Sequence, residues 1–218
     1  EIDLDKILNS VSNNTKMIFL ASPNNPTGNI LSEPDLVKLL QSELIVVIDE
    51  TYYEFCNISF SHLINKYENL IVLRSFSKWS GLAGLRIGYA ISNPKIIEKL
   101  LLIKQPYNIN TAAETVALEA ISKKDFLLEK VQILLEQRDR IYEFLQGKKG
   151  IKVYPSHANF LLVDFGEIDA NIVFETLAKN GIFVRKFSHT MISNALRISS
   201  GTPDQIRILL QVLDQFIK

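Results

Sequence analysis

Short hydrophobic runs alternate with amphipathic stretches in the first half of the chain. Three of these runs are predicted to be buried strands, at residues 17–21, 44–48 and 70–73. Between the first two, Ser32 and Pro34 are typical of the start of a helix that runs towards Gln41. A fourth, short strand is predicted over residues 86–91, with antiparallel pairing as an option. This rhythm predicts an α/β fold in which a mostly parallel sheet lies between helices.

The second half is predicted to be helical first and mixed afterwards. Residues 111–146 are compatible with helix, with a break expected near residues 122–125, and the glycines of residues 147–150 mark the clearest boundary. Beyond it, strands are predicted at 151–154, 159–164, 182–184 and 196–198, and helices at 170–179 and 203–216. Residues 1–147 are therefore expected to belong to a large α/β domain with its connecting helix. Residues 148–218 are expected to form a small α+β domain.

Composition excludes several classes of protein. Lys+Arg and Asp+Glu number 24 each among 218 residues, so no basic field favours nucleic acid or an anionic membrane. Cys56 is the single cysteine, which excludes an intrachain disulfide framework. His62, His157 and His189 lack the close spacing of metal ligands, and no apolar run reaches the roughly 18 residues of a membrane span. Because the chain starts at Glu1, without methionine or signal peptide, it is expected to begin within a longer protein.

Polar residues follow each of the three clear strands. Asn25 lies in the turn after the first, Asp49 and Tyr52 follow the second, and residues 75–78 follow the third. In an open parallel sheet the carboxyl ends of the strands meet at one edge, where ligands bind. An amide, a carboxylate, a phenol, hydroxyls and the amine of Lys78 are therefore predicted to converge.

This set of side chains matches what pyridoxal 5′-phosphate (PLP) demands. Lys78 can form a Schiff base with the cofactor and, once displaced by substrate, act as the base that moves a proton. Asp49, after an apolar run, suits the pyridine nitrogen, which a carboxylate keeps protonated. Asn25 and Tyr52 suit the ring oxygen. The phosphate would be held by Ser75, Ser77 and Arg86.

Other interpretations of these residues compete with this one. Singly, each residue has an ordinary role in a turn, a cap, packing or the solvated surface, and only their joint occurrence at successive strand ends favours the cofactor. Gly81, Gly84 and Gly88 do not fit G-x-G-x-x-G, so a dinucleotide fingerprint is rejected. Residues 75–78 also read as the S-x-x-K of serine acylases, but no K-T-G occurs in the sequence. A PLP-binding protein without catalytic activity stays open as an alternative.

The same motifs resemble a known family. Ser-Pro-Asn-Asn-Pro-Thr-Gly at 22–28, Val-Ile-Asp-Glu-Thr-Tyr-Tyr-Glu-Phe at 47–55, and Ser-Phe-Ser-Lys at 75–78 with Gly-Leu-Ala-Gly-Leu-Arg-Ile-Gly-Tyr at 81–89 resemble the aspartate aminotransferase superfamily. These are fold-type I PLP enzymes, and the likeness is greatest to the histidinol-phosphate aminotransferases. Four further segments resemble that group in the same order, at residues 104–110, 154–160, 181–185 and 196–202.

The resemblance implies a function as well as a fold. It assigns to Lys78, Asp49, Tyr52 and the other cofactor residues the roles given above. It adds Arg197 as the grip for a substrate carboxylate and Arg185 as a contact for a substrate phosphate, roles that suit the bidentate guanidinium. The implied reaction is transamination between an amino donor, L-histidinol phosphate, and a 2-oxo acid, 2-oxoglutarate, in histidine biosynthesis by a cytoplasmic or plastid homodimer. A threonine-phosphate decarboxylase or an aromatic aminotransferase would share the cofactor residues.

Two departures from the family pattern stand out. Thr51 takes a place where the family more often has alanine. Family members also carry, before the segment at 22–28, a longer N-terminal part that supplies a second phosphate-binding loop, an aromatic residue on the ring and part of the dimer contact. Residues 1–147 are therefore expected to be only the C-terminal part of a fold-type I large domain, and no metal site is expected.

Overall fold

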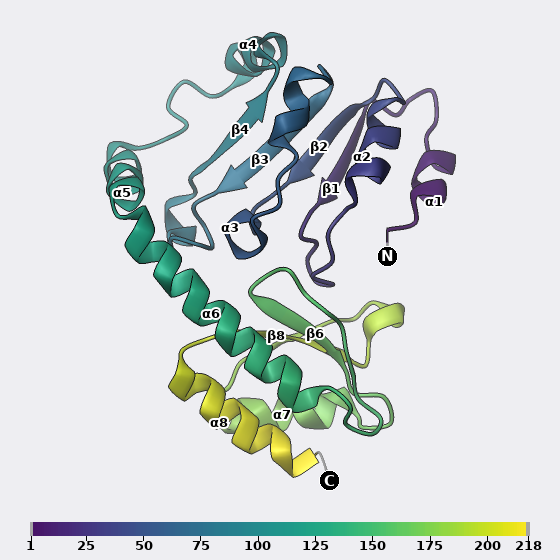
Figure 1. The fold of residues 1–218 in the computed structure, drawn as a ribbon, viewed down its shortest axis with the longest axis vertical. Helices are drawn as coiled ribbons and strands as arrows, with labels where there is room; N and C mark the ends of the chain where they lie inside the picture. The colour runs from purple at the N-terminus through teal and green to yellow at the C-terminus, as the bar shows by residue number, and fades with distance from the viewer. Residues whose placement is uncertain (1, 217–218) are drawn as a thin grey trace. The chain divides into compact units, whose positions relative to one another are not determined.

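The structure is a computed structural model that describes residues 2–216 (Figure 1). The chain divides into two compact units. The first unit comprises the residues up to Asn24 together with Asn29–Leu128, and the second comprises Asn25–Gly28 and the residues from Glu129 onwards. The domain boundary expected between residues 147 and 148, which separates the large-domain part from the small domain, stays a prediction.

A four-stranded sheet forms the centre of the first unit, in the order β1-β2-β3-β4. Its strands are β1 (Met17–Ala21), β2 (Ile45–Asp49), β3 (Leu70–Ser75) and β4 (Gly88–Ser92). The first three pair in parallel, as predicted, and β4 pairs antiparallel with β3. In this register Asp49 lies opposite Ala21 on one side and Leu73 on the other, so the ends of the three strands lie at the same edge.

The prediction that the fourth strand begins at residue 86 is wrong by two positions. Arg86 has a left-handed backbone, with φ of 57°, and follows a 3₁₀ turn at Ala83–Leu85. The strand begins at Gly88, opposite Ser75, where a side chain would come within 2.7 Å of the Arg74 carbonyl oxygen. Glycine therefore permits the close approach of β3 and β4 at this end of the sheet.

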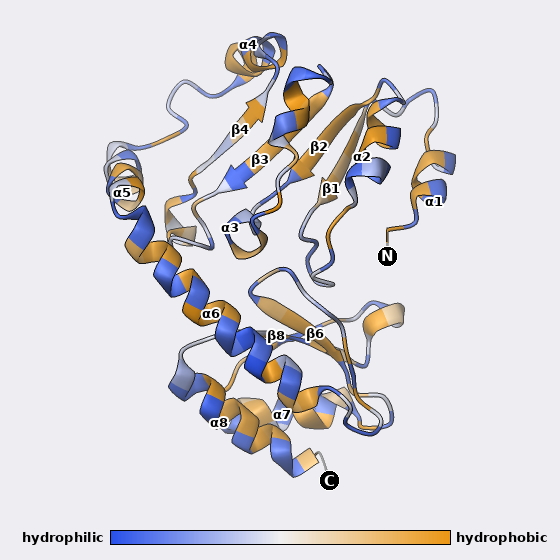
Figure 2. Cartoon of the chain, in the orientation of Figure 1, coloured by the Kyte–Doolittle hydropathy of each residue, from blue (hydrophilic) through white to orange (hydrophobic). Residues whose placement is uncertain are grey.

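One face of this sheet is covered by helices. Helix α1 (Leu4–Asn9), helix α2 (Glu33–Leu40) and a 3₁₀ turn (Ser61–Asn65) contribute to its core, and Ser32 caps α2 as predicted. The fully buried side chains of this core alternate along β2 and β3 and meet those of α2: Leu36, Leu39, Val46, Ile48, Leu70 and Val72. Figure 2 shows β2 and β3 hydrophobic along most of their length, while β3 turns hydrophilic at its carboxyl end.

The remaining helices of this half include two that the hydrophobic pattern did not reveal. Helix α3 (Tyr53–Cys56) follows β2, and helix α4 (Pro94–Ile103) begins after an Asn93 cap. Helices α5 (Thr111–Ser122) and α6 (Lys124–Leu145) are separated by Lys123, within the predicted break. Three alanines of α5 pack near the turn after β3, against Phe76 and Ile87: Ala113, Ala117 and Ala120.

The second unit contains an antiparallel sheet in the order β5-β6-β8-β7. Its elements are β5 (Lys152–Val153), β6 (Phe160–Asp164), α7 (Ala170–Lys179), β7 (Arg185–Lys186), β8 (Ala195–Ser199) and α8 (Pro203–Leu213). Helices α7 and α8 and the end of α6 supply the core that covers the sheet, with Ile141, Leu145, Leu177 and Leu213 fully buried. The unit is the predicted small α+β arrangement.

The strand predicted at residues 182–184 is wrong. These residues form a loop, and the strand is the next two residues, Arg185–Lys186. Ile182 and Val184 pack against the core of the second unit, so their apolar character reflects burial in a loop. Periodicity alone does not separate these two cases in a run of three residues.

Two negative findings apply to residues 2–216. No helix in this range is both long and apolar enough to span a bilayer. Nor does the range hold any cluster of three or more His, Cys, Asp or Glu side chains arranged for a metal ion.

Candidate active site

The carboxylate of Asp49 is held at the end of β2. Its Oδ1 accepts hydrogen bonds from the backbone N–H of Thr51 at 2.9 Å and from the Thr51 hydroxyl at 2.5 Å. An alanine at this position would supply only the first of these bonds. Thr51 therefore adds a second restraint on the orientation of the Asp49 carboxylate.

A cavity of about 380 Å³ opens beside this carboxylate. Its lining comes from the ends of β2 and β3 and from the start of β4: Asp49, Thr51, Leu73, Arg74, Ser75, Ser77, Arg86, Ile87, Gly88, Tyr89 and Ala90. The structure thus brings Asp49 together with all three residues predicted to hold a phosphate. Ser75 Oγ accepts a hydrogen bond from the Ser77 N–H at 3.0 Å, and an Arg86 guanidinium nitrogen donates to the Ala83 carbonyl at 3.0 Å.

Lys78 and Tyr52 lie near each other in the first unit. Lys78 is in the turn after Ser77, and its Nζ lies 5.8 Å from the centroid of the buried Tyr52 ring. This distance is within the range of a cation–π contact. Neither side chain lines the cavity described above.

The other three predicted residues belong to the second unit. Arg197, on β8, donates a 2.6 Å hydrogen bond to Asn25 Oδ1, although 172 positions separate the two in sequence. The Nε of Arg197 is buried and has no hydrogen-bond partner within residues 2–216. In the pairing of β7 with β8, Arg185 lies directly opposite Arg197. Two like charges opposite each other destabilise a sheet, so an anion placed between them would be favourable.

A buried ion pair beside the cavity was not found by sequence reasoning. Glu50 is fully buried, and its Oε2 accepts a 2.8 Å hydrogen bond from Arg74 Nε, whose side chain is also buried. Glu50 directly follows Asp49, and Arg74 directly precedes Ser75. One feature of the sequence does point to this ion pair. Arg74 directly follows the apolar run 70–73, and a cation buried with that run requires an anionic partner.

A second carboxyl group lies close to this pair. Burial raises the pKa of Glu54 from its ordinary value of 4.5 to about 7, and the charge of Arg74 opposes this shift only in part. The Oε2 of Glu54 is buried and has no hydrogen-bond partner in the described part of the chain. The protonated form is therefore favoured below about pH 7.

This raised pKa predicts a pH-dependent stability. The folded state binds the Glu54 proton more tightly than the unfolded state, so its contribution is complete below about pH 4.5 and is lost as the pH rises through about 7. Replacing Glu54 with Gln should therefore leave the free energy of unfolding unchanged at pH 4.5 and raise it by about 1–2 kcal/mol at pH 8, after allowance for solvent screening. Urea unfolding of both proteins across this range measures the difference, and parallel pH profiles would contradict it.

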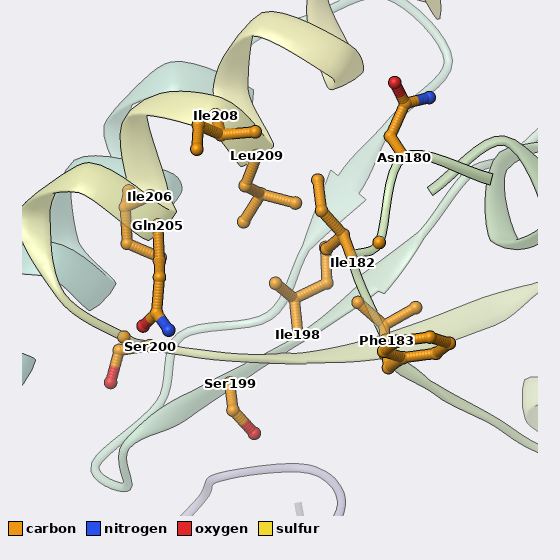
Figure 3. Close-up of a pocket in the computed structure, with 13 residues that line it drawn as sticks. Asn180, Ile182, Phe183, Ile198, Ser199, Ser200, Gln205, Ile206, Ile208 and Leu209 are labelled. Atoms are coloured by element: carbon orange, nitrogen blue, oxygen red, sulfur yellow. The ribbon is translucent and has the colours of Figure 1, made fainter. Parts of the chain in front are cut away.

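The second unit has a cavity of its own, of about 350 Å³ (Figure 3). It is lined by Asn180, Gly181, Ile182, Phe183, Val184, Ile198, Ser199, Ser200, Gly201, Gln205, Ile206, Ile208 and Leu209. Figure 3 shows hydrocarbon side chains from α8, β8 and the loop before β7 around it. None of the predicted site residues lines this cavity, and its lining carries no charged side chain, so it does not suit a phosphate or a carboxylate.

Comparison with known proteins gives consistent results. The profile of the family "Aminotransferase class I and II" matches residues 1–213. A histidinol-phosphate aminotransferase of Roseiflexus castenholzii is 42% identical over 99% of this chain and 59% of its own length. Histidinol-phosphate aminotransferase 1, chloroplastic, of Arabidopsis thaliana is also 42% identical, over 99% of this chain and 52% of its own length. The chain thus spans between half and three-fifths of these relatives.

The structural comparison agrees with the sequence comparison. A histidinol-phosphate aminotransferase of Sinorhizobium meliloti, solved in complex with PLP, has a TM-score of 0.86 and 28% identity, covering 99% of this chain and 61% of that one. The likeness confirms the predicted fold class, part of a fold-type I large domain with a small α+β domain. The family match covers both units. The chain therefore belongs to the class I and II aminotransferase family.

Proposed function

We propose that this protein is a PLP-dependent aminotransferase that transfers the amino group of L-histidinol phosphate to 2-oxoglutarate. The observation that carries the proposal is the cavity at the strand ends, where Asp49 meets Ser75, Ser77 and Arg86. Relatives that are 42% identical over 99% of this chain are named histidinol-phosphate aminotransferases, which supports the choice of substrate.

The chemistry of the cavity fits the cofactor. Two hydroxyls and a guanidinium suit a phosphate, because charge-assisted hydrogen bonds to arginine are among the strongest in proteins. The Asp49 carboxylate, oriented by Thr51, suits a protonated ring nitrogen. Asn25 and Tyr52 are proposed to bond the ring oxygen, and Lys78, in the turn that follows Ser77, to hold the cofactor covalently.

Each residue then has a defined task in the reaction. When bound, PLP supplies an electron sink that weakens the bonds to the carbon bearing the substrate's amino group. The Asp49 carboxylate would hold the ring nitrogen in its protonated form through a charge-assisted hydrogen bond. The Lys78 amine, released by the incoming substrate, would take up at Nζ the proton of the substrate carbon that bears the amino group and would pass that proton to the cofactor, which keeps the nitrogen.

The arginines of the second unit suit the anionic ends of the substrates. Arg197 has a buried Nε without a partner in the described residues, so a carboxylate there would satisfy an otherwise lost hydrogen bond. Arg185, directly opposite, is exposed and available for a phosphate. Both features support the proposal that Arg197 binds the carboxylate of glutamate or 2-oxoglutarate and Arg185 the phosphate of histidinol phosphate.

Two matched substitutions test these assignments. Replacing Arg197 with Ala should raise KM for 2-oxoglutarate by about 10–100-fold, because a hydrogen-bonded charge pair is lost, with little change in PLP retention. Replacing Arg185 with Ala should raise KM for histidinol phosphate more than KM for 2-oxoglutarate. Steady-state kinetics with each substrate varied in turn provide the measurement. Equal losses in both variants, or PLP loss that parallels the loss of turnover, would contradict the division of roles.

The cofactor and the substrate are tested separately. Borohydride reduction in the presence of PLP, followed by peptide mass spectrometry, should give a pyridoxyl adduct confined to Lys78. Lack of a specific adduct would contradict the cofactor assignment. Turnover of histidinol phosphate should then exceed that of threonine phosphate and phenylalanine, and the reverse order would assign the protein to another PLP activity.

The state of assembly and the location stay predictions from the family resemblance. We propose a homodimer, which sedimentation of the protein with PLP would detect. The Arabidopsis thaliana relative is described as chloroplastic, and cell fractionation tests the plastid or cytoplasmic location proposed for this protein.

A further inference from the structure

The buried ion pair of Glu50 and Arg74 joins the ends of two strands that carry site residues. Glu50 uses both carboxylate oxygens: Oε2 accepts from Arg74 Nε at 2.8 Å, and Oε1 accepts from the backbone N–H of Phe60 at 2.7 Å. The side chain of Glu50 is 0% exposed and that of Arg74 is 7% exposed. The pair is therefore shielded from solvent and fixed in geometry.

Arg74 has partners on its remaining sides. A terminal guanidinium nitrogen donates to Ser59 Oγ at 2.9 Å. The central guanidinium carbon lies 3.3 Å from the centroid of the Tyr53 ring, so the two planar groups are in direct contact. Tyr89 of β4 lies opposite Arg74 in the sheet. We call Glu50, Arg74, Tyr53 and Ser59 the buried network.

Three members of the buried network directly adjoin a proposed site residue in the chain. Glu50 is bonded to Asp49, Arg74 to Ser75, and Tyr53 to Tyr52. Asp49 and Ser75 line the cavity at the strand ends. A restraint on the side chain of one residue limits the backbone of its neighbour, so the buried network restrains the positions of these three site residues.

Stability alone does not explain a buried ion pair at this place. Removing two charges from water carries a large desolvation penalty, and well-packed neutral residues of similar volume often stabilise a fold as much or more. What an ion pair adds is a defined geometry, since its hydrogen bonds are directional and a displaced partner leaves a buried charge.

We propose that Glu50 and Arg74 are positioning residues, whose ion pair sets the spacing between the ends of β2 and β3 so that Asp49 and Ser75 meet the same bound cofactor. This inference rests on the proposed PLP function. It predicts that removal of both charges loosens the two strand ends and weakens cofactor binding even in a protein that remains fully folded.

The test is the double variant Glu50→Gln with Arg74→Met. The amide oxygen of the introduced glutamine keeps an acceptor for the Phe60 N–H, while the methionine fills the space of the arginine stem. We expect amide hydrogen exchange at residues 49–52 and 75–78 to become about tenfold faster or more, in the chain without cofactor and at conditions of equal global stability. The dissociation constant for PLP should rise by about tenfold or more.

A matched control removes an exposed ion pair from the same unit. Lys95 Nζ and Glu68 Oε1 lie 3.1 Å apart, with side chains 76% and 67% exposed. Glu68→Gln with Lys95→Met removes the same charges and should change neither readout, because exposed pairs contribute little.

A second pair of variants applies if the double variant does not reach the wild-type far-ultraviolet spectrum. Tyr53→Leu removes the ring that contacts the guanidinium, whereas Tyr53→Phe keeps it. We expect faster amide hydrogen exchange at residues 75–78 and weaker PLP binding for Tyr53→Leu, and no change in either for Tyr53→Phe.

The possible outcomes distinguish a failure of the positioning role of Glu50 and Arg74 from a failure of the proposed PLP function. Unchanged exchange at both strand ends, or faster exchange with unchanged PLP affinity, would overturn the positioning role. A wild-type protein that forms no adduct at Lys78 would contradict the proposed function instead, while the exchange readout would still decide whether the ion pair restrains the strand ends.

Discussion

Replacing Lys78 with Ala should abolish the covalent attachment of PLP and lower turnover by about 10⁴-fold or more. Loss of general acid–base catalysis by itself lowers rates by about 10²–10⁴-fold. The lysine has two proposed tasks, to hold the cofactor and to move the substrate proton, and alanine performs neither. Borohydride trapping with mass spectrometry measures the first task, and single-turnover kinetics measure the second. Because Lys78 is not part of the buried core, the free energy of unfolding without cofactor should change little.

A lysine elsewhere in the first unit serves as the control for this experiment. Lys95 is exposed on α4, and its Nζ donates to both carboxylate oxygens of Glu68 at 3.1 Å. Replacing Lys95 with Ala should leave the adduct on Lys78 and the rate unchanged. An adduct on another lysine with retained turnover in the Lys78 variant would contradict the proposed mechanism.

Replacing Arg74 with Met should lower the free energy of unfolding by about 3–5 kcal/mol. The substitution leaves the Glu50 carboxylate fully buried without its counter-charge, and the desolvation penalty of that charge is no longer offset. It also removes the guanidinium from the Tyr53 ring. Urea unfolding at neutral pH, followed by circular dichroism, measures the change.

The stability lost by Arg74→Met should be recovered in large part when Glu50 is also replaced by Gln. The second substitution removes the uncompensated charge and keeps an acceptor for the Phe60 N–H. Lys95→Met, which breaks an exposed ion pair, should change stability by less than about 1 kcal/mol. Two results would contradict this account of the Glu50–Arg74 pair. One is a decrease in the free energy of unfolding of less than about 1 kcal/mol for Arg74→Met, and the other is no recovery of stability in the double variant.

Local patterns in the sequence were enough to predict the main architecture and most of the cofactor-site candidates. Buried parallel strands read as continuous apolar runs, and turn residues mark their ends, so β1, β2 and β3 were predictable. Once the strands are known to be parallel, their carboxyl ends must share an edge, and Asp49, Ser75 and Ser77 follow as neighbours. Ser32 before Pro34 likewise marks the start of α2, because capping is a local hydrogen bond.

The sequence was least informative where few residues decide an element. The strand expected at 182–184 is a loop, since burial of Ile182 and Val184 depends on the helices they pack against. Helix α3 has only four residues and overlaps the motif at 47–55, which was interpreted for its cofactor chemistry, so no helix was predicted there.

Which polar groups meet became known only from the folded arrangement. The bond between Arg197 and Asn25 joins positions 172 residues apart, and the pairing of Arg185 with Arg197 depends on the register of β7 against β8. The Glu50–Arg74 pair and the raised pKa of Glu54 depend on burial, which no local pattern reports. Local backbone preferences and hydrophobic periodicity depend on residues that are near one another in the sequence. The register of strands, the desolvation of buried groups and the pairing of charges arise only when distant segments pack together and exclude water.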